Sequence, residues 1–232
     1  MKNILNILKY NFGKYNSGIS KILYMSVFII LCMLTLGIFI RVPFIGELMS
    51  VMSIAFISTF LAINFIISII KFISQISKDN GKLIFTLPIK AWEFMIAKYI
   101  EFIILQGSIA LVAYIVSSLS GNAMAEVVKM AVFGVAFGTT AAYIVITSFI
   151  VIFSSYIYNV GLCILAVIVG GGIIQSFVSG INRFITNLFP YIYLKLGSFI
   201  EIDLISMLLG ILWVGILVTI AINHLDKKLD II

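Results

Sequence analysis

Residues 71–98 read KFISQISKDNGKLIFTLPIKAWEFMIAK, a basic segment between two long apolar stretches of the chain. The segment holds five of the fifteen positive charges, at Lys71, Lys78, Lys82, Lys90 and Lys98. Lysine and arginine gather on the cytoplasmic side of membrane proteins, so the segment is predicted to face the cytoplasm. A tight turn is enough to join two membrane spans. A long, charged and structured connection indicates that a cytoplasmic partner docks on it.

The composition of the 232-residue chain is that of an integral membrane protein. Hydrophobic residues make up 62% of the chain and charged residues only 10%, whereas soluble domains carry roughly 25% charged residues. The formal net charge of +6 suits a lipid bilayer with anionic headgroups on its cytoplasmic side. Nucleic acid is not an expected partner, because its binding needs a basic face on a folded soluble module.

Six membrane spans are predicted from the uncharged stretches. A bilayer core of about 30 Å is crossed by roughly 20 apolar helical residues. The stretch Met130–Asn182 has 53 residues without a charge, which would form a helix of about 80 Å. It is therefore predicted to reverse at residues 154–159, where Ser, Tyr and Asn gather just before Gly161. The predicted spans are residues 22–40, 48–70, 100–122, 130–153, 160–181 and 204–223.

The positive charges also predict the orientation of the chain. An even number of spans places both termini on one side of the membrane. With the N-terminus in the cytoplasm, eleven of the fifteen positive charges are cytoplasmic, and the other four are Arg41, Lys129, Arg183 and Lys195. We therefore expect a multi-pass protein of the cell (cytoplasmic) membrane with both termini in the cytoplasm.

Two segments outside the spans are expected to lie at the membrane surface. Residues 1–18 are predicted to form an amphipathic elbow helix, with a frayed basic leader as the alternative. Residues 183–203 are apolar but interrupted by Pro190, Lys195 and Gly197. For them we expect an interfacial or partly re-entrant helix on the outer side, with a plain loop as the alternative. The predicted fold is an all-α membrane protein with a single transmembrane domain over residues 1–232.

The sequence lacks the patterns of common catalytic and nucleotide-binding sites. His224 is the only histidine, which excludes a zinc site of the His-Glu-x-x-His type. Gly81-Lys82 is followed by Leu83 and forms no P-loop. We therefore expect neither an enzyme nor a cofactor in this chain. Glu101 is the sole acidic candidate for ion coupling inside the membrane, and its expected role is an interfacial carboxylate or a partner of Lys98.

Polar and small residues at membrane depth leave two alternatives open. Hydrogen bonds between helices account for most of the polar residues, and a substrate path is the alternative for the rest. The residues of the possible path are Asn64, Gln106, Thr139, Tyr143 and Gln175. Gly134, Gly138 and Ala142 recur every four positions and predict close helix packing, either inside the fold or at a dimer seam.

Residues 79–98 resemble the cytoplasmic signature of ABC-2-type transporter permeases. An acidic-small-Gly turn at Asp79-Asn80-Gly81 is followed by Leu87-Pro88-Ile89, by basic and acidic residues, and by Lys98-Tyr99. Ala91-Trp92 departs from the pattern, because many members have a further Ser or basic residue there. The six-span layout is similar to that of the family over the whole chain.

The resemblance implies partners and an energy source. Two six-span subunits, identical or related, pair with two ATP-binding subunits that carry ATP and Mg²⁺. The coupling region, residues 71–90, supplies a coupling helix that fits a cleft on the ATPase. Relatives of this size export amphipathic compounds such as antimicrobial peptides or drugs from bacterial membranes. The implied ATPase-coupling residues are Lys78, Asp79, Asn80, Gly81, Lys82, Leu83, Phe85, Leu87 and Pro88.

Two other functions are compatible with the residues themselves. A self-sufficient membrane carrier or substrate-capture component would work without an ATPase partner. A scaffolding membrane protein would transport nothing.

Overall fold

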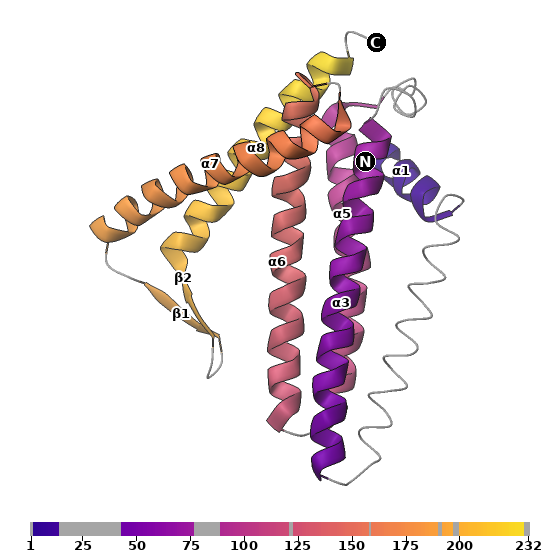
Figure 1. Ribbon diagram of the computed structural model, residues 1–232, viewed down its shortest axis with the longest axis vertical. Helices are drawn as coiled ribbons and strands as arrows, with labels where there is room; N and C mark the ends of the chain where they lie inside the picture. Colours follow the sequence, from indigo (N-terminus) through magenta and orange to yellow (C-terminus); the bar gives the residue numbers. More distant parts are fainter. Residues whose placement is uncertain are drawn as a thin grey trace. The chain divides into compact units, whose positions relative to one another are not determined.

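The computed structural model describes residues 2–13, 43–76, 89–120, 123–157, 159–189, 192–196 and 200–229. In these residues the chain forms six helices and one pair of short strands (Figure 1). The chain divides into two compact units, Met1–Tyr143 and Ile144–Ile232. Helix α6 (Ala123–Ser154) begins in the first unit and ends in the second.

The first unit is built around helix α5 (Ala91–Ser120). Helix α3 (Pro43–Ile76) runs alongside it, and the short helix α1 (Lys2–Gly13) packs against α5 (Figure 1). Proline occupies the first position of α3, where its missing N–H costs no helical hydrogen bond. The predicted elbow, residues 1–18, thus contains a helix as far as Gly13, and residues 14–18 lie outside the described part of the chain.

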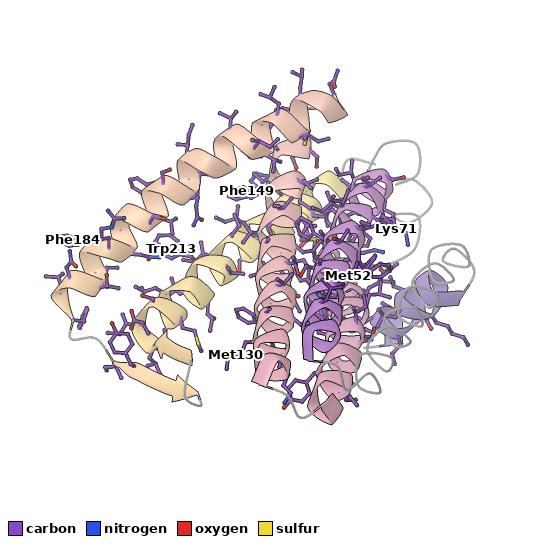
Figure 2. The ribbon with its side chains drawn as sticks, turned by 60° about the horizontal axis from the view of Figure 1, so that its bottom comes forward. Met52, Lys71, Met130, Phe149, Phe184 and Trp213 are labelled. Carbon is purple, nitrogen blue, oxygen red and sulfur yellow. The ribbon has the colours of Figure 1, made fainter. Side chains whose placement is uncertain are left out.

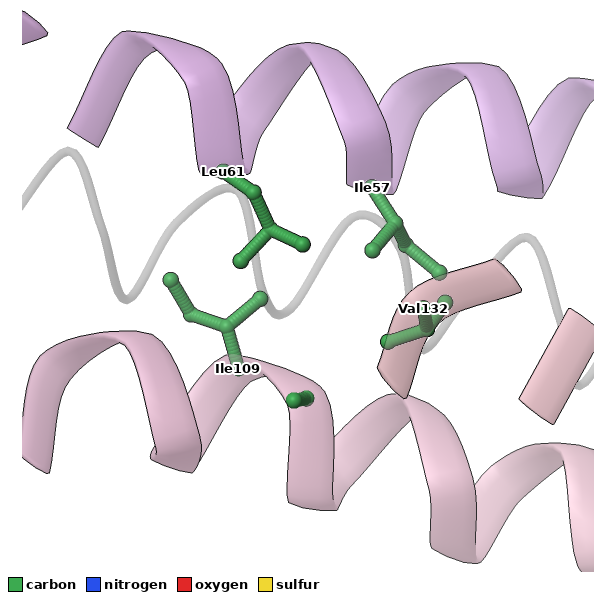
Figure 3. Close-up of a cluster of buried hydrophobic side chains, with 5 residues drawn as sticks. Ile57, Leu61, Ile109 and Val132 are labelled. Carbon is green, nitrogen blue, oxygen red and sulfur yellow. The ribbon is translucent and has the colours of Figure 1, made fainter. Parts of the chain in front are cut away.

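A small apolar cluster joins three helices of the first unit. Ile57 and Leu61 lie one turn apart on α3 and face Ile109 and Ala110 of α5 and Val132 of α6 (Figure 3). All five side chains are buried. Because the two residues of α3 are four positions apart, they share one face of the helix. This packing fixes which faces of α3, α5 and α6 point inward, and therefore which polar residues meet.

Five of the described helices are long and apolar enough to cross a membrane. Large apolar side chains remain exposed along them, Phe137, Ile168 and Phe177 among the most exposed. Such a surface would aggregate in water and suits a lipid environment. These are the helices of a multi-pass membrane protein. Their apolar segments are Ala55–Ile76, Ala91–Leu111, Lys129–Ser154, Gly161–Leu188 and Leu204–Lys227. The predicted span at residues 22–40 lies outside the described residues.

The second unit contains the end of α6, helix α7 (Val160–Leu188) and helix α8 (Leu204–Leu229). The chain reverses between Ser154 and Val160, in the segment where the sequence predicts a turn. Asn159 caps α7, because its Oδ1 accepts hydrogen bonds from the N–H of Gly161 at 2.9 Å and of Leu162 at 3.4 Å. A side-chain cap of this kind satisfies donors that the first turn of a helix leaves free.

Helices α7 and α8 are joined by a polar contact and by a hairpin. Trp213 of α8 points toward α7 (Figure 2), and its Nε1 donates to Oδ1 of Asn182 at 3.0 Å. Strands β1 (Tyr193–Leu196) and β2 (Ile200–Asp203) pair in antiparallel fashion, with Tyr193 opposite Asp203 and Leu196 opposite Ile200. Asp203 then caps α8 by accepting from the N–H of Ile205 at 3.1 Å.

The hairpin corrects the helix expected between the last two spans. The structure continues α7 to Leu188 and then forms two strands, so residues 183–203 contain no separate interfacial helix in their described part. Both strands could have been predicted from an alternating pattern. In Tyr-Leu-Lys-Leu every second residue is Leu, and in Ile-Glu-Ile-Asp every second residue is Ile. A period of two is typical of strands and places successive residues on opposite faces.

The contact between the end of α6 and the third turn of α7 depends on a glycine. A Cβ added to Gly170 would lie 2.7 Å from Cζ of Phe153, whereas one added to Gly172 would meet no atom within 4 Å. Alanine gains about 1 kcal/mol over glycine in a helix, but overpacking costs roughly 1–3 kcal/mol. We expect Gly170→Ala to be less stable than Gly172→Ala by about 1–3 kcal/mol in detergent unfolding. Equal unfolding midpoints of the two variants would contradict this close approach.

Candidate functional site

The interior of the first unit contains a hydrogen-bonded network across three helices. Asn64 of α3 donates from Nδ2 to Oε1 of Gln106 on α5 at 2.7 Å. Gln106 in turn donates from Nε2 to Oγ1 of Thr139 on α6 at 2.8 Å. Oγ1 of Thr139 donates a hydrogen bond to the carbonyl oxygen of Val135 at 2.7 Å. We call Asn64, Gln106 and Thr139 the amide network.

The amide network is fully enclosed at its centre. Gln106 is 1% exposed and Asn64 is 4% exposed. A buried polar group without a partner costs about 1–3 kcal/mol, so these side chains hold the facing helices in one register. The structure thus brings together three of the five residues of the possible substrate path, and it engages them in hydrogen bonds with one another. These three residues form hydrogen bonds between helices, which is the role that the sequence analysis expected for most of the polar residues at membrane depth.

Tyr143, the fourth residue of that possible path, lies in an aromatic cluster of the same unit. Its ring stacks on Phe102 at a centroid distance of 4.1 Å. Phe72 and Tyr99 meet the same ring edge-on, each at 6.4 Å. Tyr143 is 2% exposed. The ring of Tyr143 is therefore enclosed by aromatic side chains of α3 and α5.

A buried ion pair lies beside the aromatic cluster. Nζ of Lys98 is 2.7 Å from Oε2 of Glu101, three residues further along α5. Both residues are buried, at 5% and 8% exposure. The pairing of Glu101 with Lys98 is one of the two roles expected for that carboxylate.

The remaining predicted residues do not join this interior. Gln175 is exposed on α7, in the second unit. Gly134 and Gly138 are exposed on α6, and a Cβ added to either would meet no atom within 4 Å. Ala142, one turn further, is partly buried. The glycine positions of this stripe therefore do not serve the packing of α3, α5 and α6 against one another.

Helix α1 is held at the beginning of α5 by a residue that the sequence analysis did not single out. Oε2 of Glu93 accepts a hydrogen bond from Nδ2 of Asn3 at 3.0 Å and another from the N–H of Lys90 at 3.2 Å. The second bond is half of a capping box, in which an acidic residue three positions on satisfies a free donor before the helix. This cap could have been predicted from the sequence, because Glu93 follows Lys90 by the three positions that a capping box requires.

The nine predicted coupling residues, from Lys78 to Pro88, lie outside the described part of the chain. The structure describes both sides of them, with α3 ending at Ile76 and α5 beginning at Ala91. Among the described residues, no three His, Cys, Asp or Glu side chains come together as a metal site would require. No protein-family model, curated protein or solved structure matches this chain.

The amide network gives a measurable coupling energy. Gln106→Ala leaves the Asn64 amide buried without its acceptor, so we expect a loss of about 1–3 kcal/mol of stability. Asn64→Ala and Gln106→Ala should not add, with a coupling of about 0.6–1.7 kcal/mol as found for hydrogen bonds between membrane helices. Unfolding in mixed micelles measures both. Thr140→Ala is the control, because that hydroxyl donates within its own helix to the carbonyl of Ala136; strictly additive losses would exclude the network.

The contact of α1 with α5 is tested by hydrogen exchange. A hydrogen bond to a charged group contributes about 1.5 kcal/mol, so Asn3→Ala is expected to raise the exchange rate of α1 amides roughly tenfold. Lys9→Ala changes an exposed residue of the same helix and should leave the rate unchanged. Unaltered α1 protection in Asn3→Ala would show that Glu93 does not hold the helix.

Proposed function

We propose that the chain is the permease subunit of an ATP-driven exporter of the ABC-2 type. The observation that carries this proposal is the signature-like segment at residues 79–98. It follows α3 and continues into the first turns of α5, and both helices are of membrane-crossing length. In this proposal the chain has six spans in the cytoplasmic membrane, and both of its termini are cytoplasmic. It works as a pair with a second permease subunit and with ATP-binding subunits that hold ATP and Mg²⁺.

The surroundings of the connection support this proposal. Helices α3 and α5 pack against each other, so the connection leaves from and returns to neighbouring helices. Helix α1 contacts the first turn of α5 through Glu93, directly after the connection. A force applied to residues 77–90 would therefore reach α3, α5 and α1 together. An ATPase that docks on this connection could move several helices at once.

The buried charges favour an external energy source over ion coupling. Ion-driven carriers use an ionisable group deep in the membrane that binds and releases its ion. In this chain Nζ of Lys98 lies 2.7 Å from Oε2 of Glu101. The negative charge of the carboxylate is therefore already balanced by a side chain of the protein. The amides of Asn64 and Gln106 are likewise engaged with each other. These contacts weigh against the self-sufficient carrier as the function.

The proposed cargo is an amphipathic or hydrophobic compound, such as an antimicrobial peptide or a drug, and the proposed direction is outward. Cargo and direction come from the resemblance to small ABC-2 permeases. The exposed apolar surface of the long helices supports a route in which such a compound approaches from the lipid.

The decisive experiment measures ATPase stimulation. The ATP-binding subunit is identified by co-purification with the full chain, and its ATP hydrolysis is compared with and without the permease in nanodiscs. Lys82→Glu combined with Leu83→Ala is expected to abolish the stimulation, because it reverses a charge and removes an apolar contact of the coupling region. Lys227→Glu, at an exposed residue of α8, is the matched control and should keep it. Full stimulation by the double variant would refute the proposed docking surface.

A further inference from the structure

One face of α6 carries a positive charge followed by two exposed aromatic rings. Lys129, Phe133 and Phe137 are spaced four residues apart, so they lie above one another on the same face of the helix. Phe133 is 62% exposed and Phe137 is 74% exposed. We call these three residues the Lys129 face. It presents one ammonium group and two apolar rings to the surroundings of the protein.

A ring of α5 positions the ammonium group of this face. Nζ of Lys129 lies 5.6 Å from the centroid of the Tyr114 ring, within the range of a cation–π interaction. The same ring meets Phe133 edge-on at a centroid distance of 6.4 Å. An ammonium group has three N–H donors, and an aromatic ring covers only one side of it. Lys129 can therefore be held by Tyr114 and also donate to an anion.

The Lys129 face begins at the membrane boundary and extends into the apolar part of α6. Lys129 is the first residue of the apolar segment Lys129–Ser154, and the next residue, Met130, is labelled in Figure 2. Phe137 lies eight residues further on, about 12 Å along the helix axis. Half of the hydrocarbon core of a bilayer is about 15 Å thick. The face thus has nearly the length of one lipid leaflet, with its charge at the headgroup level.

Two glycines beside the rings leave room for an acyl chain. Gly134 and Gly138 directly follow Phe133 and Phe137, and both are exposed. A Cβ added to either glycine would meet no atom within 4 Å. Glycine lets a ligand approach the helix backbone closely. An acyl chain can therefore lie along α6 next to the rings.

The charge of the face favours a lipid over a second copy of the chain. Two copies that met through this face would bring their Lys129 ammonium groups to the same membrane level, because a symmetric dimer uses the same surface on both subunits. Like charges at that level repel each other. An anionic headgroup instead complements the ammonium group, and its acyl chain suits the exposed rings.

We propose that the Lys129 face, together with Gly134 and Gly138, binds one anionic phospholipid. Lys129 pairs with the negatively charged headgroup, and one acyl chain lies along Phe133 and Phe137. A zwitterionic headgroup carries its own cation beside the phosphate, so it is attracted less. This site goes beyond the proposed export function and requires no ATP-binding partner.

The site is tested with photoreactive lipids on the full chain in nanodiscs of phosphatidylcholine. The two probes are phosphatidylglycerol and phosphatidylcholine with the same diazirine-bearing acyl chain, and the labelled residues are mapped by mass spectrometry. We expect the phosphatidylglycerol probe to label residues 133–138 about fivefold more than the phosphatidylcholine probe, the preference that one lysine near a membrane surface provides. Equal labelling of these residues by the two probes would overturn the site.

Variants show whether Lys129 causes the preference. Lys129→Gln is expected to abolish it, whereas Lys129→Arg keeps the charge and should retain it. Arg183→Gln is the matched control, because it removes an exposed positive charge of α7 and should leave the labelling of α6 unchanged. An equal loss in Lys129→Gln and Arg183→Gln would contradict a specific site. If Lys129→Gln does not purify as a monodisperse protein, the comparison of the two probes on the unaltered chain decides.

A second copy of the chain is the competing occupant of this face. Gly138→Cys is introduced into a chain in which Cys32 and Cys163 are replaced by serine, and the protein is oxidised in the bilayer. We expect it to remain a monomer on a non-reducing gel. A disulfide-linked dimer would show that a second copy covers the face and would overturn the lipid site. None of these measurements involves ATP hydrolysis, so the test of the proposed function stands on its own.

Discussion

A polar side chain inside a lipid bilayer must find its partner within the protein, and the first unit is organised by that constraint. Helix α5 is the least apolar of the five membrane-length helices and the most enclosed. It carries Lys98, Glu101 and Gln106, all buried. Each of these groups would be costly against lipid. Helices α3 and α6 cover α5, and they bring Asn64 and Thr139 into hydrogen bonds with Gln106.

The polar contacts form two levels with different physical character. The amide network is neutral, and its hydrogen bonds demand short distances and correct directions. It therefore defines one register of α3, α5 and α6. The pair of Lys98 and Glu101 is charged, and it lies within α5.

These contacts determine which helices a force on the connection between α3 and α5 would reach. Helix α1 adds a third contact at the start of α5, through Asn3 and Glu93. A partner acting on residues 77–90 would meet a set of helices whose charged contacts lie close by and whose neutral contacts lie further in. That arrangement suits the proposed coupling to an ATPase.

Much of the architecture follows from the sequence alone, because long uncharged stretches must cross a membrane as helices. The five described membrane helices, the reversal before Val160 and the pairing of Lys98 with Glu101 all rest on local pattern. The strand pair after α7 also follows a local alternation of residues, although the sequence analysis predicted a helix there. Tertiary structure alone decided that Gln106 meets both Asn64 and Thr139. Hydropathy specifies which residues are in the membrane, but the rotation of each helix about its axis depends on packing such as that of Leu61 against Ile109.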